Sequence, residues 1–204
     1  EQTTALGANA KAGRNQSVAI GASSANGNQA VAIGSGAAAG NDSYYGSDSG
    51  MTAVGQSSIA HGQGTTALGY SSHAGGTSTT AIGNSNAYGS NTIAIGGATS
   101  GGSSTIAIGQ SATVDGGSSI ALGNGSNVYG SGSTGVGAGT KAFNSGTAVG
   151  NGVQASGSAA TAVGVGSMAT GANATAIGGG GAWQANSVAI GSGAGTNTNA
   201  IAIG

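Results

Sequence analysis

The sequence has no cysteine and no proline, and it is poor in charged and aromatic side chains. Of its 204 residues only 3 % are charged and 3 % aromatic, whereas 46 are glycine. A compact globular domain of this length would need more large apolar side chains for its core. Disulfide bonds are excluded, and the absence of cysteine does not indicate whether the protein belongs to an oxidising or a reducing compartment. Because proline cannot donate a backbone hydrogen bond, its absence fits a backbone that is paired almost everywhere.

The charge balance and the apolar runs exclude further classes of protein. The formal net charge is −1, so the chain offers no basic patch for nucleic acid. No apolar run approaches the ~18 residues of a membrane-spanning helix, and we expect no membrane contact by this chain. No signal peptide is recognisable and residue 1 is Glu, so we expect a fragment of a longer array.

One four-residue pattern returns throughout the chain. It reads Val, Ile or Thr, then Ala, then Ile, Leu or Val, then Gly, as in 18–21 and 106–109. Gly135 is the one exception at the Ala position. Fifteen copies follow one another at 13 or 14 residues, except for a step of 21 between Gly34 and Gly55. A fixed period of this kind indicates a solenoid rather than the flexible linker that Gly and Ser could also form.

Each period predicts one turn of a flattened coil. Thr66, Ala67 and Leu68 have the composition of a short strand, and Gly69 permits a turn. The second short strand of the same unit lies near Ile59. The second strand alternates small residues, such as Ser58 and Ala60, with side chains of any size. We infer that the small residues face the narrow interior.

The repeated Ala should face the same interior, which turns its aliphatic neighbours outward. A long exposed apolar stripe is implausible on a monomer, so we expect an oligomer that buries it. A competing arrangement places the aliphatic residues inside and the Ala outside, and it fits a monomer better. On the preferred arrangement the interface consists of Val18, Ile20, Val31, Ile33, Ile93, Ile95, Ile106, Ile108, Ile120, Leu122, Val188, Ile190, Ile201 and Ile203.

These repeats resemble those of a known family. The segments 186–191 (Asn-Ser-Val-Ala-Ile-Gly), 16–21 and 105–109 are similar to the head repeats of trimeric autotransporter adhesins, the YadA-like heads of Gram-negative bacteria. The resemblance covers the whole chain, 1–204. It implies a left-handed parallel β-roll of about fifteen turns and a homotrimer. It also implies display at the outer-membrane surface, through an anchor elsewhere in the parent chain. The implied partners are host extracellular matrix, cell-surface receptors, abiotic surfaces or sister cells.

The long step contains an insertion at about 40–50. It includes two of the four acidic residues and two of the five tyrosines of the chain, and loops on a rigid scaffold often carry binding. The insertion is either tolerated without a specific role or forms a contact patch. A calcium site has less support than these two interpretations, since the calcium-loop signature is missing. The candidate contacts here are Asp42, Tyr44, Tyr45 and Asp48.

A second candidate contact surface follows the second strand of successive turns. Tyr88, Asp115, Tyr129, Phe143 and Trp183 take equivalent outward places there. Exposed aromatic rings on a polar surface are plausible adhesive contacts. Alternatively, the rings stack on one another and on glycine-rich turns to cover the backbone. Of these residues, Tyr88, Tyr129, Phe143 and Trp183 are the candidate ligand contacts.

No catalytic constellation is recognisable, and we expect neither an enzyme nor a cofactor. His61 and His73 should lie about 8 Å apart on neighbouring turns, as solvated outward side chains, and two histidines alone do not make a zinc site. We expect an adhesive head that binds by many repeated contacts. The alternatives are a structural spacer, an ice-binding solenoid, whose threonine file is interrupted by Val and Ile, and an acyltransferase helix, whose six-residue period is absent.

Overall fold

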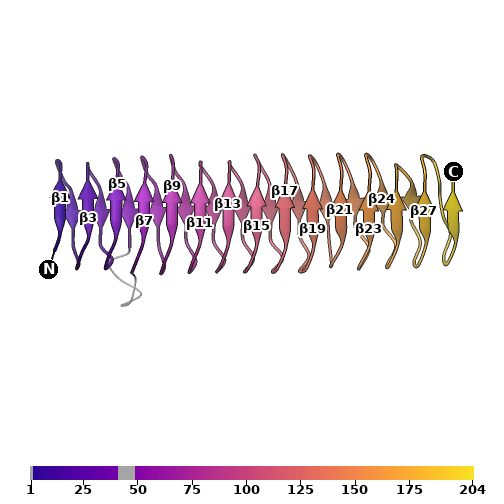
Figure 1. Cartoon of the computed structure of the whole chain (residues 1–204), viewed down its shortest axis with the longest axis horizontal. Helices are drawn as coiled ribbons and strands as arrows, with labels where there is room; N and C mark the ends of the chain where they lie inside the picture. The colour runs from indigo at the N-terminus through magenta and orange to yellow at the C-terminus, as the bar shows by residue number, and fades with distance from the viewer. Residues whose placement is uncertain (1, 41–48) are drawn as a thin grey trace. The chain divides into compact units, whose positions relative to one another are not determined.

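The computed structural model describes residues 2–40 and 49–204, and within them β-strand is the only regular secondary structure. The chain divides into two compact units, Glu1–Ser103 and Ser104–Gly204. In each unit almost every turn contributes one strand of three residues and one of two residues (Figure 1). The two kinds of strand form separate parallel sheets, which we call the long-strand sheet and the short-strand sheet. The predicted all-β parallel solenoid is thereby confirmed, and it has about 14 turns.

In the N-terminal unit, both sheets follow the order of the chain. The register is that of the repeat, so that Ala67 pairs with Ala53 and with Ala81. The long-strand sheet holds β1 (Thr4–Leu6), β3 (Val18–Ile20), β5 (Val31–Ile33), β7 (Thr52–Val54), β9 (Thr66–Leu68), β11 (Thr80–Ile82) and β13 (Ile93–Ile95). The short-strand sheet holds β2 (Lys11–Ala12), β4 (Ser24–Ala25), β6 (Ala38–Ala39), β8 (Ile59–Ala60), β10 (His73–Ala74), β12 (Asn86–Ala87) and β14 (Thr99–Ser100).

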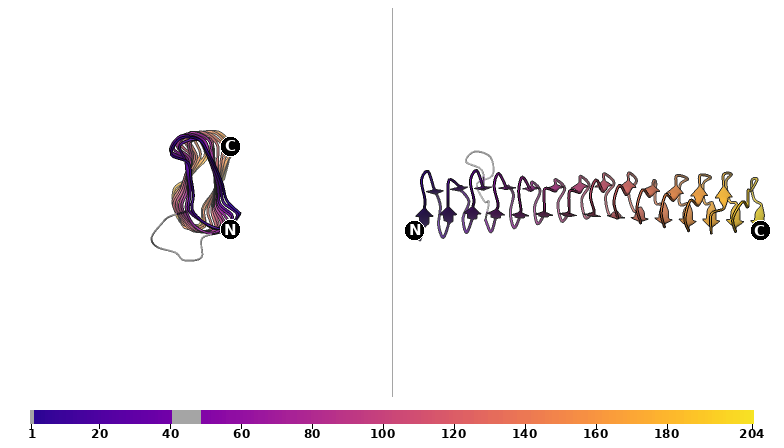
Figure 2. Two further views of the ribbon diagram at one scale, coloured as in Figure 1. Left: turned by 90° about the vertical axis from the view of Figure 1, so that its left-hand side faces the viewer. Right: turned by 90° about the horizontal axis from the view of Figure 1, so that it is seen from above.

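The C-terminal unit repeats this arrangement. Its long-strand sheet holds β15 (Ile106–Ile108), β17 (Ile120–Leu122), β19 (Thr134–Val136), β21 (Thr147–Val149), β23 (Thr161–Val163), β25 (Thr175–Ile177), β27 (Val188–Ile190) and β28 (Ile201–Ile203). Its short-strand sheet holds β16 (Thr113–Val114), β18 (Asn127–Val128), β20 (Lys141–Ala142), β22 (Gln154–Ala155), β24 (Met168–Ala169) and β26 (Gly181–Ala182). Figure 2 shows the two sides of the turns facing each other across a narrow interior.

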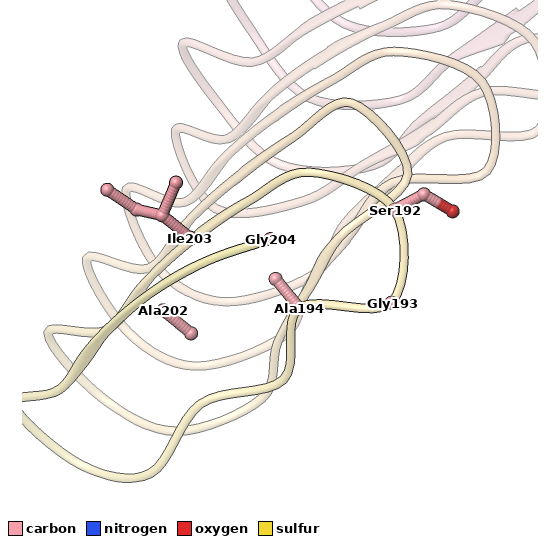
Figure 3. Close-up of a pocket in the computed structure, with 6 residues that line it drawn as sticks. All are labelled: Ser192, Gly193, Ala194, Ala202, Ile203 and Gly204. Atoms are coloured by element: carbon pink, nitrogen blue, oxygen red, sulfur yellow. The ribbon is translucent and has the colours of Figure 1, made fainter.

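The repeated Ala faces that interior, as predicted. Ala19, Ala67 and Ala121 are fully buried, whereas the aliphatic residues beside them are only half-buried or exposed. The last turn shows the alternation directly, since the methyl groups of Ala194 and Ala202 point into the turn and Ile203 points away from it (Figure 3). The competing arrangement, with the aliphatic residues inside, is therefore wrong. The interior is too narrow to take an aliphatic side chain from every turn.

Inward serines and threonines pair with the turns that precede them. The hydroxyl of Ser58 donates to the carbonyl of Gly55 at 2.9 Å, and that of Ser72 donates to the carbonyl of Gly69 at 2.8 Å. Thr65 donates in the same way to Gly62 at 3.0 Å. A buried carbonyl without a partner is costly, so these hydroxyls stabilise the turns from inside. This explains why the interior contains Ser and Thr as well as Ala.

A closing glycine such as Gly109 is needed for two reasons. Gly109 has a φ of 127°, a conformation that other residues rarely adopt. A Cβ atom on Gly109 would also lie 2.6 Å from the carbonyl oxygen of Gly123 in the next turn. Stacked backbones approach too closely at this corner for any side chain.

Gly135, the exception at the Ala position, lies opposite an unusually large interior residue. Val128 is fully buried in β18, at a place that most other turns fill with Ala. A Cβ atom on Gly135 would lie 2.9 Å from Val128 Cγ2 and 3.0 Å from Thr140 Oγ1. The missing methyl group therefore makes room for the larger side chain across the coil.

Met51 is the largest fully buried side chain among the described residues. Its equivalents in the neighbouring turns are Ala30 and Thr65, both much smaller. The other inward residues of its own turn, Ala37, Ala39 and Ala53, are all alanines. Small neighbours thus leave the volume that one flexible methionine fills.

Candidate functional site

Aliphatic side chains line the outer face of the long-strand sheet in each unit. We call this set, which consists of the fourteen predicted interface residues, the aliphatic stripe. Neighbouring turns cover one another in register, so most of these side chains are half-buried. Ile93 and Ile108 remain 37 % exposed, and Ile190 36 %. The stripe is thus outward-facing and unpaired within the described chain.

Threonines interrupt the aliphatic stripe in both units. Thr52, Thr66 and Thr80 occupy the first strand position in three consecutive turns of the N-terminal unit. The C-terminal unit has a longer run, in which Thr134, Thr147, Thr161 and Thr175 are in register. The third position of these strands stays aliphatic throughout, so the outer face is apolar along one edge and mixed along the other.

Two predicted contact residues stack on each other above the short-strand sheet. The rings of Tyr129 and Phe143, on adjacent turns, lie with centroids 5.3 Å apart and planes 27° apart. Tyr129 is 47 % exposed and Phe143 is half-buried. Because each ring covers a face of the other, the pair presents edges and the Tyr hydroxyl to solvent.

Trp183 lies over glycines rather than over another ring. A Cβ atom on Gly181 would collide with the indole, and one on Gly195 would lie 2.8 Å from it. Gly181 and Gly195 form a parallel bridge, so the indole covers two adjacent turns. It is 53 % exposed and, together with Met168, borders a shallow hollow floored by glycines. In both aromatic sites the rings therefore cover a neighbouring ring or glycine-rich backbone, as in the alternative to adhesive contacts.

Tyr88 belongs to a row of three rings that includes both histidines. The ring of His73 lies edge-on to His61, with centroids 5.7 Å apart, and to Tyr88, with centroids 5.2 Å apart. The prediction of separate, solvated histidines is wrong, because both are half-buried and their rings meet. Burial lowers the pKa of His73 from its ordinary value of 6.5, and the charge of His61 lowers it further.

The predicted contacts in the insertion, Asp42, Tyr44, Tyr45 and Asp48, lie outside the described residues. Sequence reasoning also missed two exposed side chains, which are Tyr70 (63 %) and Val165 (74 %). Tyr70 and Val165 each follow the closing glycine of a repeat. That turn position was a signal for exposure, since a side chain there leaves the coil at a corner.

Metal-ligating side chains are sparse in the part of the chain that the structure describes. Residues 2–40 and 49–204 contain no group of three or more His, Cys, Asp or Glu side chains that could hold a metal ion. Nor does this part of the chain include a helix long and apolar enough to cross a membrane. What the surface offers is a repeated aliphatic stripe on one sheet and scattered rings on the other.

These features define a class, namely a parallel β-solenoid built from one short repeat whose apolar residues face outward. A family model described as YadA head domain repeat (2 copies) matches residues 1–24, 22–37, 52–72, 60–86, 100–126, 155–180 and 182–194, which is more than half of the chain. The chain therefore belongs to this family and is a YadA-like head domain of the trimeric autotransporter adhesins. No curated protein matches it in a sequence comparison.

Proposed function

We propose that the chain is the adhesive head of a homotrimeric, left-handed β-roll displayed on the outer membrane of a Gram-negative bacterium. It acts without catalysis, by attaching to host extracellular matrix, host cells, abiotic surfaces or sister cells. The observation that carries the proposal is the outward direction of the aliphatic stripe, together with membership of the YadA head family.

The stripe supports assembly through its energetics. Completing the burial of a partly exposed Ile or Leu contributes about 0.5–1 kcal/mol, and the repeat supplies such residues turn after turn. A closed symmetric interface uses the same patch on every copy, which suits a stripe of this kind. The family supports three copies, and the short-strand sheets then stay free on the outside.

Three identical outer faces would strengthen weak contacts. Tyr88, Tyr129, Phe143 and Trp183 all lie on the short-strand side, away from the aliphatic stripe. When one contact forms, the others are held near the same surface, so the avidity exceeds the affinity of a single ring. We include Asp42, Tyr44, Tyr45 and Asp48 of the insertion as further proposed contacts.

The experiment compares assembly and adhesion in one pair of variants. Ile108→Asp places charges from several chains at one buried seam and should convert the trimer into monomers in light scattering. Asn127→Asp adds the same charge to the outer face of the short-strand sheet and should leave the mass unchanged. Binding to collagen, fibronectin, laminin and cultured cells should weaken strongly for Ile108→Asp only.

Two results would contradict the proposal. An unchanged trimer mass for Ile108→Asp would show that the aliphatic stripe is not the interface. Failure of the unsubstituted chain to bind any tested surface would indicate a spacer instead. In that case an unrelated segment of equal length should replace this one in the parent protein without loss of adhesion.

A further inference from the structure

The histidine pair lies on the short-strand side beside Tyr88, and neither histidine is among the proposed adhesion contacts. His73 belongs to β10, and His61 follows directly after β8, the neighbouring strand of the short-strand sheet. Ala60 and Ala74 face the interior, so both histidines point to the outer face of this sheet. That face is opposite the aliphatic stripe, and the pair is therefore accessible whether or not the chain assembles.

The two imidazoles are close enough to act together. Their ring centroids lie 5.7 Å apart with the planes at 84°. A divalent transition metal bonds imidazole nitrogen at about 2.0–2.1 Å, so one ion between two rings keeps their centroids at a comparable separation. The two rings are thus close enough for one nitrogen of each to bind a shared ion.

The surroundings of His73 restrict its ring to this place. Gly75 lies beneath it, and a Cβ atom on Gly75 would be 3.4 Å from His73 Nε2 and 3.5 Å from Tyr88 Cδ1. Tyr88 packs edge-on against the side of His73 that faces away from His61, with centroids 5.2 Å apart. A ring held between two neighbours loses less conformational entropy when it binds.

The ring nitrogen atoms of both histidines are available as metal ligands. Within residues 2–40 and 49–204, no hydrogen bond to either imidazole is formed by another residue. Neutral imidazole is a good ligand for Cu²⁺, Ni²⁺ and Zn²⁺, whereas Mg²⁺ and Ca²⁺ prefer oxygen. The lack of a hydrogen-bonded outer shell argues for modest rather than high affinity.

We propose that His61 and His73 form a two-histidine chelate for a divalent transition metal ion on the outer face of the N-terminal unit. Water completes the coordination, because no third protein donor of the described residues joins the pair. Cu²⁺ should bind more tightly than Ni²⁺ or Zn²⁺, following the general order for nitrogen ligands. The open coordination positions distinguish this site from a structural zinc site, which is closed by four protein ligands.

The test uses the full chain without a polyhistidine tag. Calorimetric titration with Cu²⁺, Ni²⁺ and Zn²⁺ should give one ion per chain for Cu²⁺, and the Cu²⁺ electron paramagnetic resonance spectrum should show coupling to two imidazole nitrogens. His61→Asn and His73→Asn should each weaken Cu²⁺ binding by at least about tenfold and reduce the coupling to one imidazole. Tyr88→Phe keeps the ring and removes the hydroxyl, so its affinity should match that of the unsubstituted chain.

Circular dichroism of each variant establishes that the fold is intact, which outward substitutions should preserve. Unchanged Cu²⁺ affinity in the double variant His61→Asn/His73→Asn would place the ion elsewhere and overturn the proposal. Coupling to a single imidazole in the unsubstituted chain would overturn the chelate as well. Loss of binding in Tyr88→Phe would show that the phenol is a ligand, which contradicts a two-histidine site.

Discussion

Gly135 offers the sharpest test of the narrow interior. In Gly135→Ala the new Cβ atom would lie 2.9 Å from both Ser126 Oγ and Val128 Cγ2 and 3.0 Å from Thr140 Oγ1. Three side chains must move, and two of them share a hydrogen bond of 2.6 Å between Ser126 Oγ and Thr140 Oγ1. Overpacking of this kind costs about 1–3 kcal/mol. The reduced freedom of the unfolded chain returns about 0.4–1 kcal/mol, so we expect a net loss of about 1–2 kcal/mol.

A second substitution should relieve the clash. Val128→Ala alone removes two buried methyl groups and should destabilise the chain by about 1–2 kcal/mol. In Gly135→Ala/Val128→Ala the new methyl group occupies part of the vacated space, and the pair becomes like the Ala–Ala pairs of other turns. The double variant should therefore be more stable than the sum of the single variants predicts, by about 1–3 kcal/mol.

Guanidinium denaturation followed by circular dichroism measures all three variants. Ala148→Gly, at the neighbouring position in register with Gly135, is the matched control. It should lose about 0.5–1 kcal/mol because Gly weakens a strand and no large residue needs the space. If Gly135→Ala is as stable as the unsubstituted chain, or if the two single changes simply add, then size matching across the coil is not what selects Gly135.

Two further predictions concern the buried Met51 and the row of three rings formed by His61, His73 and Tyr88. Met51→Ala should destabilise the chain by about 2–4 kcal/mol, because removing a fully buried side chain leaves a cavity. Met168→Ala, at a site 39 % exposed, should cost under about 1 kcal/mol. Equal losses of stability in denaturation would contradict this. The folded state binds the His73 proton less readily than the unfolded chain, so stability should fall as the pH drops from ~7 to ~5, and less so in His73→Asn. Nuclear magnetic resonance should place the midpoint of His73 below 6.5, and a higher midpoint would show that burial does not control it.

The sequence alone determined the period, the strand pattern and the inward direction of the repeated Ala. In a stacked coil each residue meets its equivalent one turn away, so spacing along the chain becomes position in space. The closing glycines and the alternation of small and variable residues carry this information in every copy. The same reasoning gives Tyr129 and Phe143 equivalent outward places after the second strand.

Only the tertiary structure decided what happens across the coil and between side-chain ends. The match of Gly135 to Val128 joins two strands on opposite sides of one interior, a contact that the repeat spacing does not encode. His61 and His73 occupy offset positions whose backbones suggested separate side chains, yet rotation about the side-chain bonds brings the rings together over Gly75. Periodicity fixes the path of the backbone, whereas the volume of neighbouring residues fixes where each side chain points.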